Sequence, residues 1–545
     1  MLGKSFRSSV AGVWYHQKKA KWRGKDLLPK PCSKGRRSLS AAKVARGTVY
    51  ITVQNILTSV MGIIFYIVAA RFLTPSDIGA MAAFQFVIAI YTTISILSLQ
   101  TAATKYMSEE IGRGRPEVAA EIAVLTLKIV AVSSTLILCL AYLSSPLLAD
   151  KLLGDPSRSL IFTVTFLSAF FGVLKQMYVS FFQGVQRLDL FAITHIVTVL
   201  VSSGLAVLAV VLGYGLIGVV NAWLASQIVG FALSIFFYRG CLPRSSKSGY
   251  PVGRLFGFAF PLLLLGLLGL VTSWSDRMVF LALSGSLADL GVYDLAVRGS
   301  MTLSVIPYAV GIAILPAFSE LYGRTGKEGM SRATKISTRY LAYLIFPAAI
   351  GLAAISETSL AFLFGDAYSL AGFPLAILSV AYIMTAYNVV FMTALQAIGE
   401  TGVFIRIAVA TMVAQTSLVT VLSPSLGMLG PTLARTAMQV VGFAYPLYEL
   451  GRRIDVEIDM KAAGGAALAS CLMALPIRLA DGMLKGVLAT PYRFVLDVLF
   501  GVLLYSILVI LLKLLEKNDL ELLRQVAPRE AGPALDLLER FLPDN

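Results

Sequence analysis

The residues of this sequence best placed to bind a ligand are the few ionisable side chains that lie within long apolar stretches. Such a side chain is costly to place in hydrocarbon, so it usually faces a polar cavity, a charged partner or a substrate. The planar guanidinium of Arg, in particular, matches the oxygens of a phosphate group. The candidates are Lys128, Lys175, His195, Asp276, Arg277, Asp294, Arg298 and Arg435.

Depth within the apolar stretch separates these candidates. Lys128 and Arg298 each lie about ten residues inside a stretch, roughly 15 Å at 1.5 Å per residue, which is near the middle of a bilayer. Lys175 lies near the end of its stretch, where a long basic side chain can reach the membrane surface, so we expect an anchor there. A lone histidine such as His195 is more often a packing residue than a titrating one.

Spacing along the helices gives the remaining expectations. Asp294 and Arg298 are four residues apart and share one helical face, so they either neutralise each other or leave Arg298 to bind an anionic head group. Asp276 and Arg277 are adjacent, so their side chains diverge by about 100°. The expected substrate-binding set, in which positive charges outnumber negative ones, is Arg298, Lys128, Arg277, Asp276, Asp294 and Arg435.

The elements that position these side chains are expected to be transmembrane helices. Hydrophobic residues make up 57% of the 545 residues and charged residues only 14%, and the mean hydropathy is +0.79. Stretches of about 20 apolar residues, each long enough to cross a bilayer, recur along the chain. We predict an all-α membrane protein with about fourteen spans, at 48–70, 80–104, 119–144, 158–180, 189–212, 215–238, 255–283, 289–316, 337–356, 370–395, 402–423, 427–449, 461–480 and 492–512.

The chain also repeats itself at an offset of about 212 residues, a sign of a duplicated helix bundle. Asp77-Ile78-Gly79 recurs as Asp289-Leu290-Gly291, and the loop at 108–117 recurs at 319–328. An even number of predicted spans separates equivalent positions, so both copies cross the membrane in the same direction. Two parallel copies that face each other can open to either side in turn, which predicts alternating access.

This repeat divides the chain into five predicted parts. They are a basic cytoplasmic tail at 1–47, an N-terminal six-helix lobe at 48–250, a C-terminal six-helix lobe at 251–453, two additional helices at 454–515 and a cytoplasmic tail at 516–545. Arg435 stands where the first lobe has Trp223, so this charge breaks the symmetry between the lobes.

The basic residues predict the orientation. Most of the 46 Lys and Arg residues fall on the N-terminal side of the predicted spans, and the positive-inside rule makes that side cytoplasmic. We therefore expect a multi-pass plasma-membrane protein with both termini in the cytoplasm. The net charge of +16 is spread over loops that flank the membrane, so we expect membrane lipids as partners and no nucleic acid.

Three ordered motifs resemble those of a known transporter family. They are Arg71-Phe72-Leu73-Thr74-Pro75-Ser76-Asp77-Ile78-Gly79, Asp276-Arg277 and Gly291-Val292-Tyr293. On a repeated frame with two extra C-terminal helices, over roughly residues 48–515, the chain resembles the polysaccharide-export and O-antigen flippase family of the multidrug/oligosaccharidyl-lipid/polysaccharide superfamily. The resemblance implies a flippase that moves an oligosaccharide, linked to a polyprenyl phosphate or pyrophosphate, to the outer leaflet.

Two other functions stay open at this point. A drug or cation antiporter of the same superfamily would share the frame, but its site should present unpaired carboxylates rather than an excess of Arg and Lys. A membrane glycosyltransferase would need acidic residues in an outer loop to hold a metal or act as a base, and the predicted outer loops contain no Asp-x-Asp pair. The sequence has no phosphate-binding loop for ATP. We therefore expect no enzyme activity and no cofactor. We expect a gradient of H⁺ or Na⁺, or the consumption of the product, to drive transport.

Overall fold

The computed structural model describes residues 41–241 and 249–514 of the chain. These residues form helices and turns without a strand, and one isolated bridge joins Lys485 and Leu488. The predicted all-α fold is confirmed. Both predicted tails lie outside the described residues, except for 41–47, which already belong to the first helix.

The helices follow the predicted spans closely, and most ends differ by a few residues. The first half contains α2 (Ala41–Phe72), α3 (Pro75–Ile96), α4 (Leu99–Gly112), α5 (Pro116–Leu153), η1 (Pro156–Arg158), α6 (Ser159–Gly184), α7 (Leu188–Val211) and α8 (Gly215–Tyr238). The rest contains α9 (Val252–Ser284), α10 (Leu287–Met301), η2 (Thr302–Ser304), α11 (Val305–Ala354), α12 (Ser356–Phe364), η3 (Asp366–Ala371), α13 (Gly372–Ala397), α14 (Val403–Leu426), α15 (Leu429–Gly451), α16 (Met460–Leu484) and α17 (Thr490–Leu511).

Within the described residues, 12 helical segments are long and apolar enough to cross a membrane, so the predicted count of about fourteen is not confirmed. The predicted spans 289–316 and 337–356 belong to one continuous segment, Leu287–Ala354. The predicted span 427–449 forms α15, which is not among the 12 segments. Its hydropathy is lowered by a buried face that carries Thr432, Arg435, Gln439 and Glu449.

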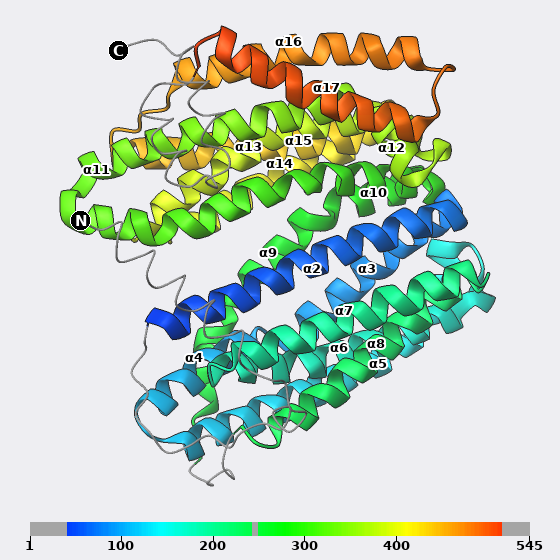
Figure 1. Ribbon diagram of the computed structural model, residues 1–545. Helices are drawn as coiled ribbons and strands as arrows, with labels where there is room; N and C mark the ends of the chain where they lie inside the picture. The colour runs from blue at the N-terminus through cyan, green and yellow to red at the C-terminus, as the bar shows by residue number, and fades with distance from the viewer. Residues whose placement is uncertain (1–40, 242–248, 515–545) are drawn as a thin grey trace, which may run out of the picture.

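The long helix α11 bends where the loop between two spans was predicted. At 1.5 Å per residue a straight helix of 50 residues would be about 75 Å long, more than twice the thickness of a bilayer core. Gly326 interrupts α11 with φ 65° and ψ −140°, a conformation that glycine adopts without strain. The segment therefore turns back at Gly326, and Figure 1 shows the bend at the same end of the molecule as the start of α2.

The predicted span 80–104 is also interrupted. Leu97 and Ser98 have φ of 51° and 56° and separate α3 from α4. Side chains other than glycine adopt such angles with some strain, and no glycine or proline in the sequence marks this break. The membrane-crossing part is Pro75–Ile96.

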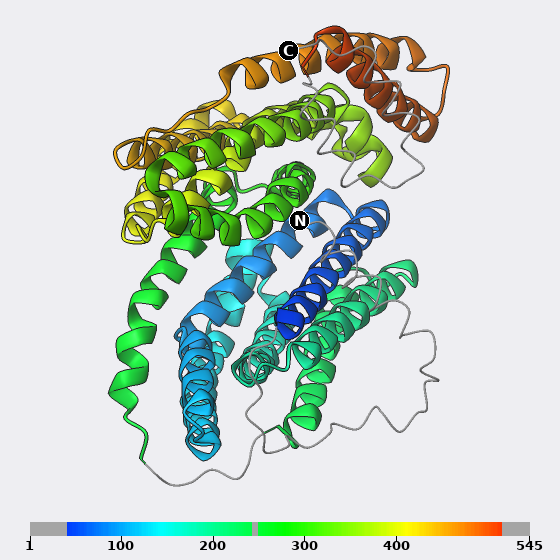
Figure 2. The same cartoon turned by 60° about the vertical axis from the view of Figure 1, so that its left-hand side comes forward.

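Equivalent helices make equivalent contacts in the two halves. Helix α2 packs on α7 as α9 packs on α14, and α6 and α7 pack on α8 as α13 and α14 pack on α15. Figures 1 and 2 show α2–α8 in one group and α11–α15 in another, with α16 and α17 along the outer side of the second group. The lobe boundaries at 250/251 and 453/454 stay a prediction.

The two halves of the chain come into backbone contact where α3 crosses α10. Thr74 and Ser286 cap these helices by accepting hydrogen bonds from the backbone N–H groups of Asp77 and Asp289, at 3.2 and 3.1 Å. Two residues later stand Gly79 and Gly291. A Cβ added to Gly79 would lie 1.9 Å from the Leu287 carbonyl oxygen, and one added to Gly291 would lie 2.0 Å from that of Pro75. The repeated Asp-x-Gly motif thus begins both helices and supplies their crossing point.

Candidate functional site

Five of the six predicted site residues lie together at the junction of three helices. Asp276 and Arg277 come from α9, Asp294 and Arg298 from α10, and Arg435 from α15. We call these five residues the charge cluster. They bring residues up to 159 positions apart into contact, so the cluster exists only in the folded bundle.

Asp294 is bound by two arginines at once. Its carboxylate oxygens lie 2.8 Å from Arg277 Nε and 2.6 Å from Arg298 Nε, and its side chain is fully buried. The predicted local ion pair between Asp294 and Arg298 does form, but it is not exclusive. Arg277 also lies over the ring of Trp274, with its guanidinium carbon 4.9 Å from the ring centre.

Asp276 holds the second pair of the cluster. One carboxylate oxygen accepts hydrogen bonds from Arg435 Nη1 at 2.7 Å and from the Tyr293 hydroxyl at 2.8 Å. Asp276, Tyr293 and Arg435 are all buried. The lobe asymmetry at Arg435 therefore has a structural reason, because this arginine neutralises an acid that is specific to α9.

Arg298 reaches from the second half to the first. Its Nη2 donates to Gln85 Oε1 at 2.7 Å, and Gln85 Nε2 donates to the Tyr66 hydroxyl at 2.6 Å. The guanidinium carbon also lies 3.9 Å from the centre of the Tyr66 ring, a favourable cation–π distance. Sequence reasoning missed Gln85 and Tyr66 because neither carries a charge in its apolar stretch.

Arg298 is also the accessible member of the charge cluster. Its side chain is 24% exposed, whereas the side chains of Arg277 and Arg435 are 5% and 9% exposed and both aspartates are fully buried. A ligand that approaches the cluster can therefore contact Arg298 directly.

The structure does not bring Lys128 to the charge cluster. Lys128 is exposed on α5 along the same face as Val124, Val132 and Leu136, and among the described residues it has no ion pair or hydrogen bond. Helix α5 packs on α3, α4 and α6. Depth in a span says nothing about the direction in which a side chain points, so a role of Lys128 in substrate binding stays a prediction.

Lys175 was expected to reach the membrane surface as an anchor, but its side chain is buried within the protein. It is only 7% exposed, and a Cβ added to Gly230 on α8 would lie 2.8 Å from its Cδ atom. His195 packs against Phe191, with ring centres 4.8 Å apart, as a packing residue would.

The chemistry that this arrangement can support is anion binding. Three arginines and two aspartates leave one surplus positive charge, and both aspartates are already paired with arginines. A cation at either carboxylate would lie beside an arginine that already neutralises it. The partly exposed side chain of Arg298 can instead donate to an approaching anion.

Comparisons with known proteins agree with this fold. A protein from Haloferax volcanii, "Probable low-salt glycan biosynthesis flippase Agl15", is 22% identical over 488 residues, which cover 89% of this chain and 99% of that protein. "Lipid II flippase MurJ" of Bacillus subtilis is 21% identical over 368 residues, 60% of this chain and 67% of that protein.

Solved structures show the same fold. The structure titled "Lipid II flippase MurJ, inward closed conformation" has a TM-score of 0.70 at 14% identity and covers 85% of this chain and 98% of its own. An inward-facing multidrug resistance MATE family transporter has a TM-score of 0.63 at 16% identity and covers 74% of this chain and 98% of its own.

The family follows from the sequence match itself. The model of the family described as "Polysaccharide biosynthesis protein" matches residues 44–322, about half of the chain, from α2 into the first part of α11. This range includes four of the five cluster residues and both glycines of the α3–α10 crossing. The chain belongs to the polysaccharide biosynthesis protein family of multi-pass membrane proteins.

Proposed function

We propose that this protein is a flippase that moves a lipid-linked oligosaccharide or polysaccharide precursor across the plasma membrane by alternating access. In this proposal Arg298 binds a phosphate or pyrophosphate group of the polyprenyl carrier. The observation that carries it is the exposed fraction of Arg298 in an otherwise buried cluster with one surplus positive charge.

The position of Arg298 supports a role in transport. It lies on α10 in the second half and is hydrogen-bonded to Gln85 on α3 in the first half. Alternating access moves the two halves relative to each other. A phosphate that binds Arg298 would compete for the guanidinium with Gln85, and substrate binding would in this way loosen a contact between the halves.

The names of the relatives support the substrate class. Agl15 is named as a glycan biosynthesis flippase and MurJ as a flippase of lipid II. The family description also refers to polysaccharide biosynthesis. The proposal names the substrate by its class, a glycan linked to a polyprenyl lipid, and names a gradient of H⁺ or Na⁺ as the coupling.

The drug or cation antiporter is the weaker alternative. Its support is the likeness to the MATE family transporter, which at 16% identity concerns the fold alone. Both buried carboxylates of the charge cluster are paired with arginines at 2.6–2.8 Å, so the cluster has no excess of negative charge to attract an organic cation.

A leaflet-accessibility assay tests the proposal. Vesicles that contain the purified protein and a lipid-linked oligosaccharide are treated with a membrane-impermeant reagent that modifies the glycan. We expect the modified fraction to rise well above that of protein-free vesicles. Arg158→Ala, a change at an exposed arginine at the end of η1, serves as a variant that should transport normally. Equal modification with and without protein would overturn the proposal.

A further inference from the structure

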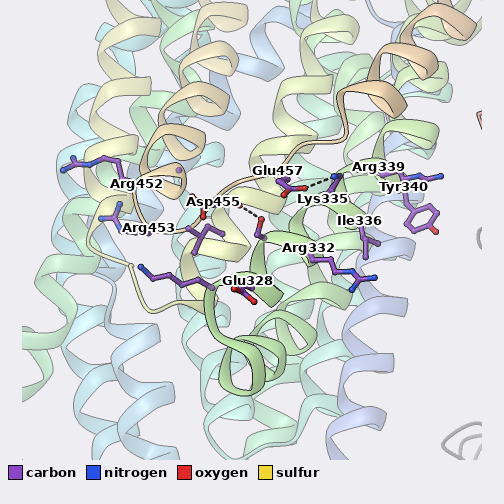
Figure 3. Close-up of a pocket in the computed structure, with 14 residues that line it drawn as sticks. Glu328, Arg332, Lys335, Ile336, Arg339, Tyr340, Arg452, Arg453, Asp455 and Glu457 are labelled. Carbon is purple, nitrogen blue, oxygen red and sulfur yellow. Dashed lines mark hydrogen bonds and ion pairs between the residues drawn. The ribbon is translucent and has the colours of Figure 1, made fainter.

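A second basic site lies away from the charge cluster, at the end of the molecule where α11 bends. A cavity of about 860 Å³ opens between α11 and the segment that links α15 to α16, and Figure 3 shows its lining side chains. This volume is in the range of about 300–1,000 Å³ that is typical of small-molecule sites. None of the residues that line the cavity belongs to the charge cluster.

Basic side chains dominate the lining. The three acidic ones are Glu328, Asp455 and Glu457, and the six basic ones are Lys327, Arg332, Lys335, Arg339, Arg452 and Arg453. Figure 3 shows Arg332 and Arg339 toward one end of the cavity and Arg452 and Arg453 toward the other, with Lys335 and Glu457 between them. The cavity therefore presents positive charge at both ends.

Part of this charge is used within the protein. Lys335 Nζ lies 2.7 Å from Glu457, and Arg453 lies 2.5 Å from Glu449 and 3.2 Å from Glu400. These contacts hold the linker segment against α11 and against the turn between α13 and α14.

The charge that remains is carried by Lys327, Arg332 and Arg452. All three are exposed, and none has an ion pair with another described residue, although Arg452 lies 5.8 Å from the centre of the Tyr448 ring. A guanidinium without a carboxylate partner keeps its forked donors available, and these match the oxygens of a phosphate group.

Two of the basic lining positions of α11 are not basic in the first half of the repeat. At the offset of 211 residues that relates loop 108–117 to loop 319–328, Arg332 and Lys335 correspond to Glu121 and Val124. Glu121 has a different task, because its carboxylate accepts hydrogen bonds from the backbone N–H groups of Gly249 and Tyr250, at 2.7 and 3.0 Å. The duplicated frame therefore does not itself require basic residues at these positions.

The level of the cavity relative to the membrane also fits the binding of a phosphate group. The lining residues of α11 run from 327 to 340, across the start of the predicted ninth span at 337. The phosphates of a bilayer lie just outside its hydrocarbon core, at the level where a span begins. Basic residues at that level attract the anionic groups of the membrane surface.

We infer that this cavity is a binding site for a phosphate group, separate from the site at Arg298. The phosphate comes either from an anionic lipid at the membrane edge or from a soluble phosphate ester, and the guanidinium groups of Arg332 and Arg452 are its donors, each at its own end of the cavity. This inference does not depend on which substrate the protein transports.

Thermal unfolding of the purified full chain in a neutral detergent tests the inference. One arm adds inorganic pyrophosphate, another adds short-chain phosphatidylglycerol, and a third adds phosphatidylcholine of the same chain length. We expect at least one of the two anionic probes to raise the unfolding midpoint in a saturable way, and phosphatidylcholine to have no such effect. Saturation by phosphatidylglycerol alone identifies a lipid head group, and saturation by pyrophosphate identifies a soluble ester.

Matched variants locate the binding. The double variant Arg332→Gln/Arg452→Gln should weaken binding of the active probe about tenfold or more, since two charge-assisted hydrogen-bond donors are lost. Arg239→Gln/Arg324→Gln removes the same charge from exposed positions outside the lining and should bind as the unmodified protein does. Equal weakening in both double variants, or no saturable effect of either anionic probe, would overturn the inference.

Discussion

At the scale of single residues, Asp294 forms ion pairs with two arginines, and this determines how the charge cluster responds to substitution. A buried carboxylate that loses its sole partner costs about 3–5 kcal/mol. Asp294 has two partners, Arg277 and Arg298, at 2.8 and 2.6 Å. Removal of Arg298 therefore leaves Asp294 neutralised, whereas removal of Asp294 leaves Arg277 buried without a carboxylate.

We expect Arg298→Ala to fold and to lose transport. Arg298→Lys keeps the charge but loses the forked donors, so it should transport at a reduced rate. Asp294→Ala should instead destabilise the protein by about 3 kcal/mol or more, because Arg277 is then stranded. The measurements are thermal unfolding in detergent and the leaflet-accessibility assay on the same preparations. Full transport by Arg298→Ala would show that Arg298 has only a structural role.

The sequence predicted the members of this cluster better than their partners. An ionisable residue in an apolar stretch is a visible signal, and it found Asp276, Arg277, Asp294, Arg298 and Arg435. The pairing of Asp276 with Arg435 depends on how α9 and α15 pack, which no local pattern reveals. Asp497 in α17 was missed among the charges inside spans, although it is 2% exposed and lies within a predicted span.

At the scale of helices, the crossing of α3 and α10 depends on the absence of two side chains. The atoms that a new Cβ would meet at Gly79 and Gly291 are backbone carbonyl oxygens, which cannot rotate away as a side chain can. The helices themselves would have to separate, and they carry Gln85 and Arg298, which join the two halves.

We therefore expect Gly291→Ala to lower the stability of the protein by at least about 3 kcal/mol, the upper part of the range for overpacked cores. The thermal unfolding midpoint in detergent and the elution profile in size-exclusion chromatography measure this effect. Gly62→Ala and Gly269→Ala are the matched controls, because a Cβ there would meet nothing within 4 Å. These controls should be neutral or slightly stabilising, since Ala favours the helix. Equal midpoints for Gly291→Ala and the controls would contradict the close crossing.

Helix positions were predictable from apolar runs, but helix continuity was not. The predicted span 215–238 coincides with α8 (Gly215–Tyr238). The break after α3 instead uses Leu97 and Ser98, residues without a turn preference strong enough to mark it. Conversely, a loop was predicted around Gly326, but only Gly326 itself is non-helical there, and α11 continues on both sides of it.

At the scale of the whole molecule, the repeat was the most informative feature of the sequence. A constant offset predicted two equivalent helix groups, and the equivalent packing of α2 on α7 and of α9 on α14 agrees with it. The sequence could not reveal the basic cavity, because its walls come from α11 and from the linker between α15 and α16, and their approach depends on how these helices pack.

The orientation in the membrane is the remaining prediction at this scale. The turn after α5 and the bend in α11 lie at opposite ends of the helices (Figure 1), and Asp155 and Arg324 at these places have side chains 42% and 74% exposed. In a variant whose native cysteines are replaced, a cysteine at Arg324 should react with a membrane-impermeant maleimide only after permeabilisation. A cysteine at Asp155 should react in intact cells, because the basic residues concentrate on the side of Arg324 and make that side cytoplasmic. The background variant without cysteines controls for labelling of other groups, and reaction of both positions from the same side would rule out this topology.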